Sequence, residues 1–258
     1  YIENFLLDMK KQTLFNSCEL IIINANSPQN EEKYIMPFVE QNSNVTYKKL
    51  DYRATVMETE NMAIKMATGE FFAQACVDDA HHPEYIEILS KHLYFSEDID
   101  LVYADCLQTT NPLETFDNNS SNGNRYEHSI NNFSRENMIK CLPGPMPMWK
   151  LSVHDKAGYF NEEMKYAGDW DMFLRMVDNG SKFKKIDIPL GLYYYNNDGL
   201  STSNEYASER IKEEATVFFQ YKHIFGERNF NRYKDYFQQG LQKDEWKKIP
   251  SDIIGIDW

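Results

Sequence analysis

The sequence has few cysteines, and it lacks the spacings that mark a zinc site or a redox pair. The four cysteines stand singly, as Cys18, Cys76, Cys106 and Cys141. No CxxC motif is present, so a cysteine-bound zinc ion is not expected. Because Cys18 and Cys76 flank or lie in apolar runs, we expect them to be reduced residues of the core.

Long hydrophobic runs and an excess of positive charge are also absent. No apolar stretch is long enough to span a bilayer and no signal peptide is visible, which predicts a soluble cytoplasmic protein that meets membranes only through partners. With 27 basic and 40 acidic residues, the formal net charge is −13. This charge argues against a nucleic-acid groove, because phosphate backbones bind to basic surfaces. A bound Mg²⁺ or Mn²⁺ ion would still let an acidic protein hold a nucleotide diphosphate.

The composition that is present is ordinary for a globular protein. Of the 258 residues, 42% are hydrophobic and 26% are charged. This predicts one large domain, or one domain with a helical appendage. Ile2, Phe5, Leu6 and Met9 have helical spacing. No cap or linker precedes them, so we expect the chain to begin inside a fold.

Strand and helix patterns alternate through the first 105 residues. Short apolar runs predict buried strands at 20–23, 45–50, 71–77 and 99–105. Helices are expected between them, at 29–40, 55–67 and from Pro83 onward. The alternation predicts an α/β fold with a mainly parallel, Rossmann-like sheet flanked by helices. In such sheets, ligands bind beyond the carboxyl ends of the strands.

The second part of the chain has a different pattern. The polar stretch 107–132 predicts a long, mobile surface loop, and 143–149 predicts a rigid irregular segment. A helix is expected over 170–177, followed by one or two strands over 183–195. The apolar stripe within 205–240 predicts helices that pack on the rest of the chain or on a second subunit.

Two adjacent acids, Asp78 and Asp79, follow one of the predicted buried strands. Carboxylate oxygens are preferred ligands of Mg²⁺ and Mn²⁺. The alternative is a solvated turn with a helix cap, where aspartate is also common. His81 and His82 point in different directions as neighbours, so they are not expected to share a metal ion, and we expect at least one of them to be an exposed histidine at the entry to a helix.

A second group of acids lies in GDWDMFLR, at residues 168–175. Asp169 is expected near the start of a helix, where it could cap the helix or accept a proton from a hydroxyl group. Asp171 and Arg175 are four residues apart and could pair along the helix.

Taken in order, IIINANS, NMAIKMATGEFFAQACVDDAHHP, GYFNEE and GDWDMFLR resemble a family-2 glycosyltransferase of the GT-A fold. The resemblance runs from about residue 1 to residue 203. It implies that Asp78 binds the metal ion with Asp79 beside it, and that Asp169 is the catalytic base. It also implies nucleotide contacts at Asn24, Ser27 and Asn61.

The sequence departs from the family pattern at several positions. The family's first strand would precede Tyr1, Cys76 stands where a first aspartate is common, and Asn24 replaces a carboxylate. Gly168 replaces a usual glutamate before the base, and Thr55 replaces a usual glycine.

The resemblance implies an inverting transfer from a nucleotide-diphosphate sugar, most simply a UDP-sugar, to a hydroxyl group, with Mn²⁺ or Mg²⁺ as cofactor. The acceptor would be a glycan, a lipid-linked group or a protein, and a homo-oligomer or upstream domains are conceivable partners. We divide the chain into a GT-A domain at 1–203, with nucleotide-sugar and acceptor halves at 1–105 and 106–203, and a helical extension at 204–258.

Three residues are predicted on the acceptor side: Trp149, Trp170 and Asp171. Aromatic faces suit sugar rings, but the two tryptophans, like Tyr166, could equally belong to the core. Two other functions stay open. One is a non-catalytic module of a glycan-synthesis protein, suggested by the departures. The other is a nucleotidyltransferase, which would normally show a glycine-rich basic loop near the amino end.

Overall fold

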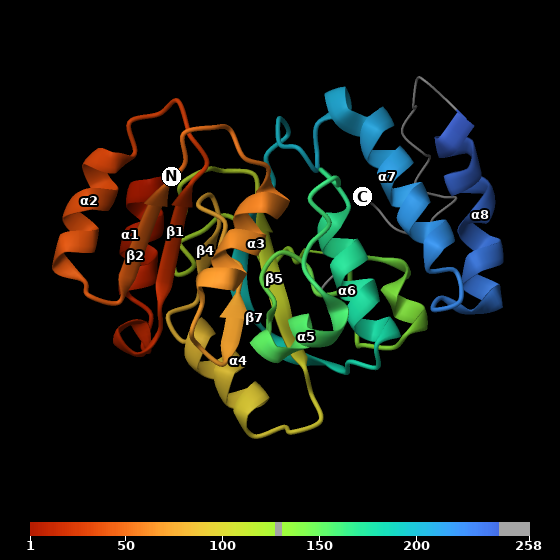
Figure 1. The fold of residues 1–258 in the computed structure, drawn as a ribbon, viewed down its shortest axis with the longest axis horizontal. Helices are drawn as coiled ribbons and strands as arrows, with labels where there is room; N and C mark the ends of the chain where they lie inside the picture. Colours follow the sequence, from red (N-terminus) through yellow and green to blue (C-terminus); the bar gives the residue numbers. More distant parts are fainter. Residues whose placement is uncertain (127–130, 243–258) are drawn as a thin grey trace.

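The computed structural model describes residues 1–126 and 131–242 (Figure 1). Its first elements are α1 (Ile2–Lys10), β1 (Leu20–Asn24), α2 (Glu32–Gln41), β2 (Val45–Lys49), α3 (Val56–Met66), β3 (Phe71–Ala73), β4 (Ala80–His81), α4 (Tyr85–Tyr94) and β5 (Leu101–Thr109). They are followed by β6 (Met148–Lys150), α5 (His154–Ala157), α6 (Gly168–Asp178), β7 (Phe183–Tyr194), α7 (Ala207–Gln220) and α8 (Gly226–Gln242). The predicted alternation of strands and helices is confirmed. None of the described helices is long and apolar enough to cross a membrane.

The strands form two sheets, and their pairing is more mixed than predicted. β1 and β2 form a parallel pair, and a second sheet has the order β3-β6-β5-β7-β4. In that sheet only β5 and β7 are parallel, whereas the other three pairs are antiparallel. The predicted α/β class is therefore confirmed: the second sheet is mixed, but the two parallel pairs are the longest, with five residue pairs between β1 and β2 and nine between β5 and β7.

Two strand predictions differ in detail from the structure. β3 stops at Ala73 rather than at residue 77, because its partner β6 is only three residues long and offers no pairing beyond Ala73. Conversely, Met148–Lys150 is a strand where an irregular segment was expected. The prolines of that segment end at Pro147, so each residue of β6 keeps the N–H that a sheet requires.

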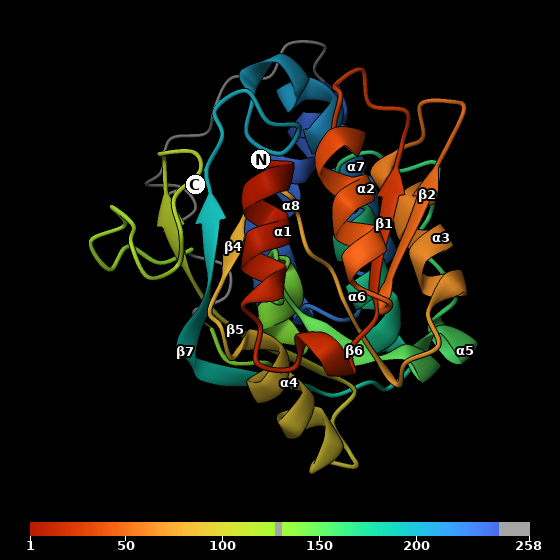
Figure 2. The same cartoon turned by 90° about the vertical axis from the view of Figure 1, so that its left-hand side faces the viewer.

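Helices cover both faces of the two-stranded sheet. α1 and α2 lie side by side on one face of β1 and β2, and α3 lies on the other (Figures 1 and 2). Phe5 and Met9 of α1, Ile35 of α2 and Ile22 of β1 belong to one core cluster there. α1 is also tied to β4, because Asp8 accepts the backbone N–H of His81 at 3.0 Å.

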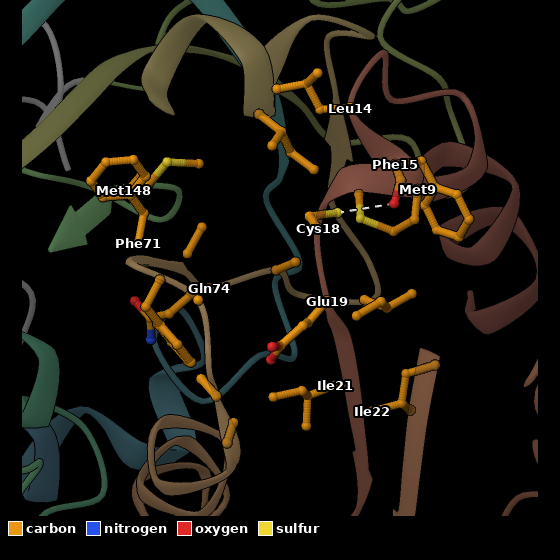
Figure 3. A pocket seen from close by; sticks show the side chains of 18 of the residues that line it. Met9, Leu14, Phe15, Cys18, Glu19, Ile21, Ile22, Phe71, Gln74 and Met148 are labelled. Atoms are coloured by element: carbon orange, nitrogen blue, oxygen red, sulfur yellow. Dashed lines mark hydrogen bonds between the residues drawn. The ribbon is translucent and has the colours of Figure 1, made fainter. Parts of the chain in front are cut away.

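A groove separates the two sheets. In the described residues, β1 pairs only with β2, and β3 pairs only with β6. A cavity of about 670 Å³ lies between their facing edges, lined by side chains that include Ile21 and Phe71 (Figure 3).

The C-terminal helices share a core with the rest of the chain. α7 lies beside α6, and α8 packs on the far side of α7 (Figure 1). One core cluster contains Met57 of α3, Phe173 of α6, Phe218 of α7 and Phe237 of α8. The predicted helices of 205–240 are therefore confirmed, and they pack on the predicted catalytic part. Residues 243–258 of the predicted extension lie outside the described residues.

Replacement of Phe218 by alanine is expected to destabilise the protein strongly. Phe218 is fully buried, and its ring stacks on Phe225, Phe230 and Phe237 at centroid distances of 5.5, 5.3 and 4.4 Å. Loss of a buried phenylalanine typically costs about 3–5 kcal/mol. Urea unfolding should show this loss, whereas Leu241→Ala, at a side chain 46% exposed, should stay near the parental stability. Equal effects of the two variants would contradict this packing.

Candidate functional site

Cys76, Asp78 and Asp79 come together in the turn that follows β3. The Cys76 Sγ and one carboxylate oxygen of each aspartate all lie within 4.8 Å of one another. The Asp79 N–H donates to the Cys76 carbonyl at 3.3 Å and closes the turn. Two carboxylates and a sulfur atom at this spacing fit a divalent cation. Sequence analysis predicted the Asp78 ligand but placed Cys76 in the core, which is wrong, because the Cys76 side chain is exposed.

Asp79 is the buried member of this group. Its Oδ1 accepts the backbone N–H of Tyr194, at the end of β7, at 2.9 Å. Burial, with a further contribution from the negative charge of Asp78, raises the pKa of Asp79 to about 8. Two acids therefore compete for ionisation in one turn, and a bound cation would relieve that competition.

The neighbouring histidines do not belong to this group. His81 is buried, and its Nδ1 lies 2.9 Å from the Asp8 carboxylate of α1. His82 is half-buried, and its Nδ1 accepts the N–H of Glu84 at 3.1 Å. The expectation of an exposed histidine is therefore wrong, since both side chains hold β4 and the start of α4 in place.

Asn24 is the last residue of β1, and Ser27 lies in the loop that follows this strand. The Asn24 Oδ1 accepts the Ser27 N–H at 2.9 Å, and its Nδ2 donates to the Tyr47 hydroxyl at 3.1 Å. Asn26 between them adopts a positive φ of 58°. Asn24 thus shapes this loop through its side chain, and a nucleotide contact at Asn24 or Ser27 stays a prediction.

Asn61 of α3 has its side-chain amide engaged within the protein. Its Nδ2 donates to the Phe160 carbonyl and to Glu162, each at 2.9 Å, and its Oδ1 accepts the Phe160 N–H at 2.8 Å. The side chain is 2% exposed. Asn61 therefore joins α3 to the loop before α6, and its predicted nucleotide contact is not tested by these bonds.

Asp169 lies in the first turn of α6, two positions after the N-cap. The N-cap residue is Ala167, so the predicted capping position is corrected. The Asp169 Oδ1 accepts the Trp170 N–H at 2.8 Å, and its Oδ2 accepts the Cys141 thiol at 3.4 Å. Burial raises the pKa of Asp169 above its ordinary value. A carboxylate with a raised pKa is a better proton acceptor, as a general base requires.

The structure brings the two acidic groups to the same site. Cys76 keeps accessible surface, but surrounding protein atoms desolvate its thiol, and this raises the pKa of the thiol well above its ordinary value. The negative charges of Asp79, Asp78, Glu60 and Asp169 raise it further. Asp169 of α6 is therefore close enough to act electrostatically on the turn after β3. These residues lie about 90 positions apart in the chain, and the fold places them together.

The predicted acceptor-side residues are core residues instead. Trp149 is fully buried and donates its Nε1–H to His154 at 3.0 Å. Trp170 is 5% exposed and donates its Nε1–H to the Met138 carbonyl at 2.8 Å. Asp171 is buried between the Tyr221 hydroxyl and Arg175, each at 2.9 Å. The core alternative is correct for both tryptophans, and the predicted Asp171–Arg175 pair is confirmed.

Sequence reasoning missed the contribution of α7 to this site. Glu213 accepts backbone N–H groups just before α6, and Glu214 lies near Asp169. The only feature of α7 that could be recognised in the sequence was its apolar stripe, and this stripe predicted packing rather than a role in the site. Charged residues on the polar face of an amphipathic helix are usually solvated, so nothing local distinguished these two glutamates.

Glu214→Gln is expected to weaken the pH dependence of stability. Burial, opposed by Arg210 and reinforced by Asp169, raises the pKa of Glu214 from 4.5 to about 7. Because the pKa of Glu214 is higher in the folded protein than in the unfolded chain, the stabilisation by protonated Glu214 is complete below about pH 4.5. It is lost as the pH rises through about 7. Glutamine stays neutral, so urea unfolding at about pH 5 and pH 8 should show a smaller difference in the free energy of unfolding.

A matched control for that measurement is Glu209→Gln, at an exposed position of the same helix. It should keep the parental difference between the two pH values. An unchanged difference in Glu214→Gln would contradict the expected titration of Glu214.

Comparison with known proteins supports the resemblance. The model of glycosyl transferase family 2 matches residues 1–157. An uncharacterized glycosyltransferase of Bacillus subtilis, YwdF, is 24% identical over 213 residues, which cover 80% of this chain and 73% of the relative. The chondroitin synthase of Pasteurella multocida is 26% identical over 190 residues, which cover 72% of this chain but only 18% of that protein.

Solved structures show the same fold. The structure of S. aureus TarS 1-349 in complex with UDP has a TM-score of 0.69 at 16% identity, covering 98% of this chain and 73% of that one. The mannosyltransferase PcManGT from Pyrobaculum calidifontis, in complex with GDP-Man and Mn²⁺, has a TM-score of 0.67 at 13% identity. That match covers 93% of this chain and 68% of PcManGT. With the family match spanning more than half of its residues, the chain belongs to glycosyl transferase family 2 and has the GT-A fold.

Proposed function

We propose that the chain transfers a sugar from a nucleotide-diphosphate donor, most simply a UDP-sugar, to a hydroxyl group with inversion at the anomeric carbon. The observation that carries this proposal is the proximity of two acidic groups with different environments. The accessible Asp78 and the buried Asp79 stand in one turn with Cys76, and Asp169, whose pKa is raised by burial, is close enough to act on this turn electrostatically. The first group suits a cation, and the second suits proton transfer.

The residues of the turn would hold Mn²⁺ or Mg²⁺. When bound, the ion would offset the negative charge of the nucleoside diphosphate leaving group. Asp78 is the principal ligand in this proposal, and Cys76 and Asp79 offer further ligand atoms. The Tyr194 N–H keeps Asp79 oriented through its bond to Oδ1.

Asp169 would accept the proton of the acceptor hydroxyl. The oxygen then attacks the anomeric carbon from the face opposite the leaving group, the bond to the diphosphate breaks, and the configuration inverts. The Trp170 N–H keeps one carboxylate oxygen in place. The other oxygen bonds only weakly to the Cys141 thiol, a poor donor, and is the better placed of the two for a hydroxyl proton.

The partners follow from the same site. UDP in the TarS structure and GDP-Man with Mn²⁺ in the PcManGT structure support a nucleotide-sugar donor. A glycan, a lipid-linked group or a protein would provide the acceptor hydroxyl, as proposed from the sequence. A cytoplasmic location and a homo-oligomer remain predictions.

A donor screen tests this function. The chain is incubated with a panel of UDP- and GDP-sugars, with Mn²⁺, Mg²⁺ or a chelator, and release of the nucleotide diphosphate is measured. We expect release with one donor class that depends on the metal ion and increases with a suitable acceptor. Tight binding of a donor or glycan without release by any donor would favour the non-catalytic alternative.

A further inference from the structure

Glu213 of α7 holds the backbone that leads directly into α6. Its carboxylate accepts the N–H of Lys165 at 2.9 and 3.0 Å, one distance to each oxygen. One of those oxygens also accepts the N–H of Tyr166 at 2.7 Å and that of Ala167 at 3.1 Å. Three consecutive backbone donors therefore converge on one side chain from a helix that lies alongside α6 (Figure 1).

The start of α6 needs an acceptor from outside the helix. Its N-cap residue, Ala167, makes no side-chain cap bond, and its first residue, Gly168, has no side chain. The N–H groups at a helix start lack acceptors within the helix and carry partial positive charge, so a carboxylate is favoured beside them. Bonds to an ionised acceptor are also shorter and stronger than neutral ones. Glu213 meets this need for the N–H of the N-cap residue Ala167, and its other bonds hold the two residues that lead into the helix.

Other contacts fix the same turn from two further directions. Gly168 packs so closely on α3 that a Cβ at this position would lie 2.5 Å from the Met57 Sδ. Asp171 is fixed to α7 by its bond to the Tyr221 hydroxyl. Asp169 lies between these two residues, so its backbone can move only if the contacts on α3 or on α7 give way.

We propose that Glu213 is a positioning residue for Asp169. It holds residues 165–167, and with them the first turn of α6, which carries the Asp169 carboxylate. This inference rests on the proposed function, because it takes Asp169 as the base. Glu213 itself contacts backbone rather than substrate, so it acts through the geometry of Asp169. A displacement of a reacting group by about 1 Å can cost a factor of about 10² in rate.

The test compares Glu213→Ala and Glu213→Gln with the parental chain. In Glu213→Ala, kcat should fall about 10²-fold while the KM and calorimetric affinity for the donor stay within about twofold. Glu213→Gln should retain an intermediate rate, because its carbonyl oxygen can still accept N–H groups. The matched control is Glu209→Gln, one turn earlier on α7. Glu209 accepts the Tyr166 hydroxyl at 2.7 Å and should leave kcat near the parental value when replaced.

Hydrogen exchange provides a measurement that does not depend on transfer. Amides 165–171 should exchange at least about 10-fold faster in Glu213→Ala, with the rest of the chain unchanged. An unchanged exchange rate there, or a parental kcat in Glu213→Ala, would overturn the inference. A kcat loss as large in Glu209→Gln as in Glu213→Ala would also overturn it. Faster exchange combined with no transfer by the parental chain would support the positioning contact and contradict the proposed function.

Discussion

Asp169→Asn should nearly abolish sugar transfer while leaving the fold and donor binding intact. General base catalysis is typically worth about 10²- to 10⁴-fold in rate, and an amide cannot accept the proton. Asparagine keeps the shape of aspartate and an oxygen that can accept the Trp170 N–H, which is bonded at 2.8 Å in the parental chain. The expected result is therefore a loss in kcat of about 10²- to 10⁴-fold, with an unchanged affinity for the donor.

Three measurements on the purified variant check this expectation. Steady-state transfer gives kcat, and calorimetry gives the affinity for the donor. Thermal unfolding should give a melting temperature within a few degrees of the parental value, which corresponds to a change of about 1 kcal/mol or less in the free energy of unfolding. Asp171→Asn is the contrasting variant. Asp171 is buried and bonded to Tyr221 and Arg175, so its replacement should lower stability more than it lowers the rate of the folded enzyme.

A parental transfer rate in Asp169→Asn would exclude Asp169 as the base. The Asp169 carboxylate would then only stabilise the first turn of α6, through its bond to the Trp170 N–H. Glu214 would be the next candidate, because it lies near Asp169 and its pKa is raised to about 7. The rate of Glu214→Gln measured against pH would decide that alternative.

The elements predicted best from the sequence are those whose pattern is local. The apolar run at Leu20–Ile23 and the amphipathic stripes of α6 and α7 carry their own signal, because burial determines where their apolar residues stand. The strand at Met148–Lys150 was missed because it is three residues long and follows three prolines. Only its partners β3 and β5, distant in sequence, make it a strand.

In the site, too, the features that a local pattern encodes could be predicted, and those set by residues distant in the sequence could not. The two acidic motifs at 78–79 and 169 could be identified because, together with the other motifs and in their order, they resemble the family pattern, whereas each alone also fits a turn or a helix cap. Their environments could not be predicted, since the neighbours that set them come from elsewhere in the chain. Glu213 meets its backbone partners across 46 to 48 residues. Trp149 and Trp170 show the opposite error, because an aromatic side chain suits a sugar and a core equally well.

Asp78→Ala is expected to remove metal-dependent binding of the nucleotide diphosphate. Asp78 contributes one of three ligand atoms that lie within 4.8 Å of one another, and alanine offers none. Loss of residues that merely orient metal ligands typically weakens binding by 10- to 100-fold, so loss of a ligand should cost at least about 100-fold. Calorimetry of UDP binding with Mn²⁺, with Mg²⁺ and with a chelator should show this in the parental chain as a metal-dependent affinity.

The design separates the ligand role of Asp78 from its charge. In the Asp78→Ala variant, the affinity for UDP should be the same with and without metal. Asp98→Asn removes one negative charge at an exposed side chain that pairs with Lys182, and it should bind like the parental chain. Asp78→Asn keeps an oxygen ligand without the charge, so its affinity for UDP in the presence of metal should lie between that of Asp78→Ala and that of the parental chain. UDP binding that needs no metal and survives Asp78→Ala would show that the turn after β3 does not hold the cation. The diphosphate charge would then have to be offset by basic or backbone N–H groups instead.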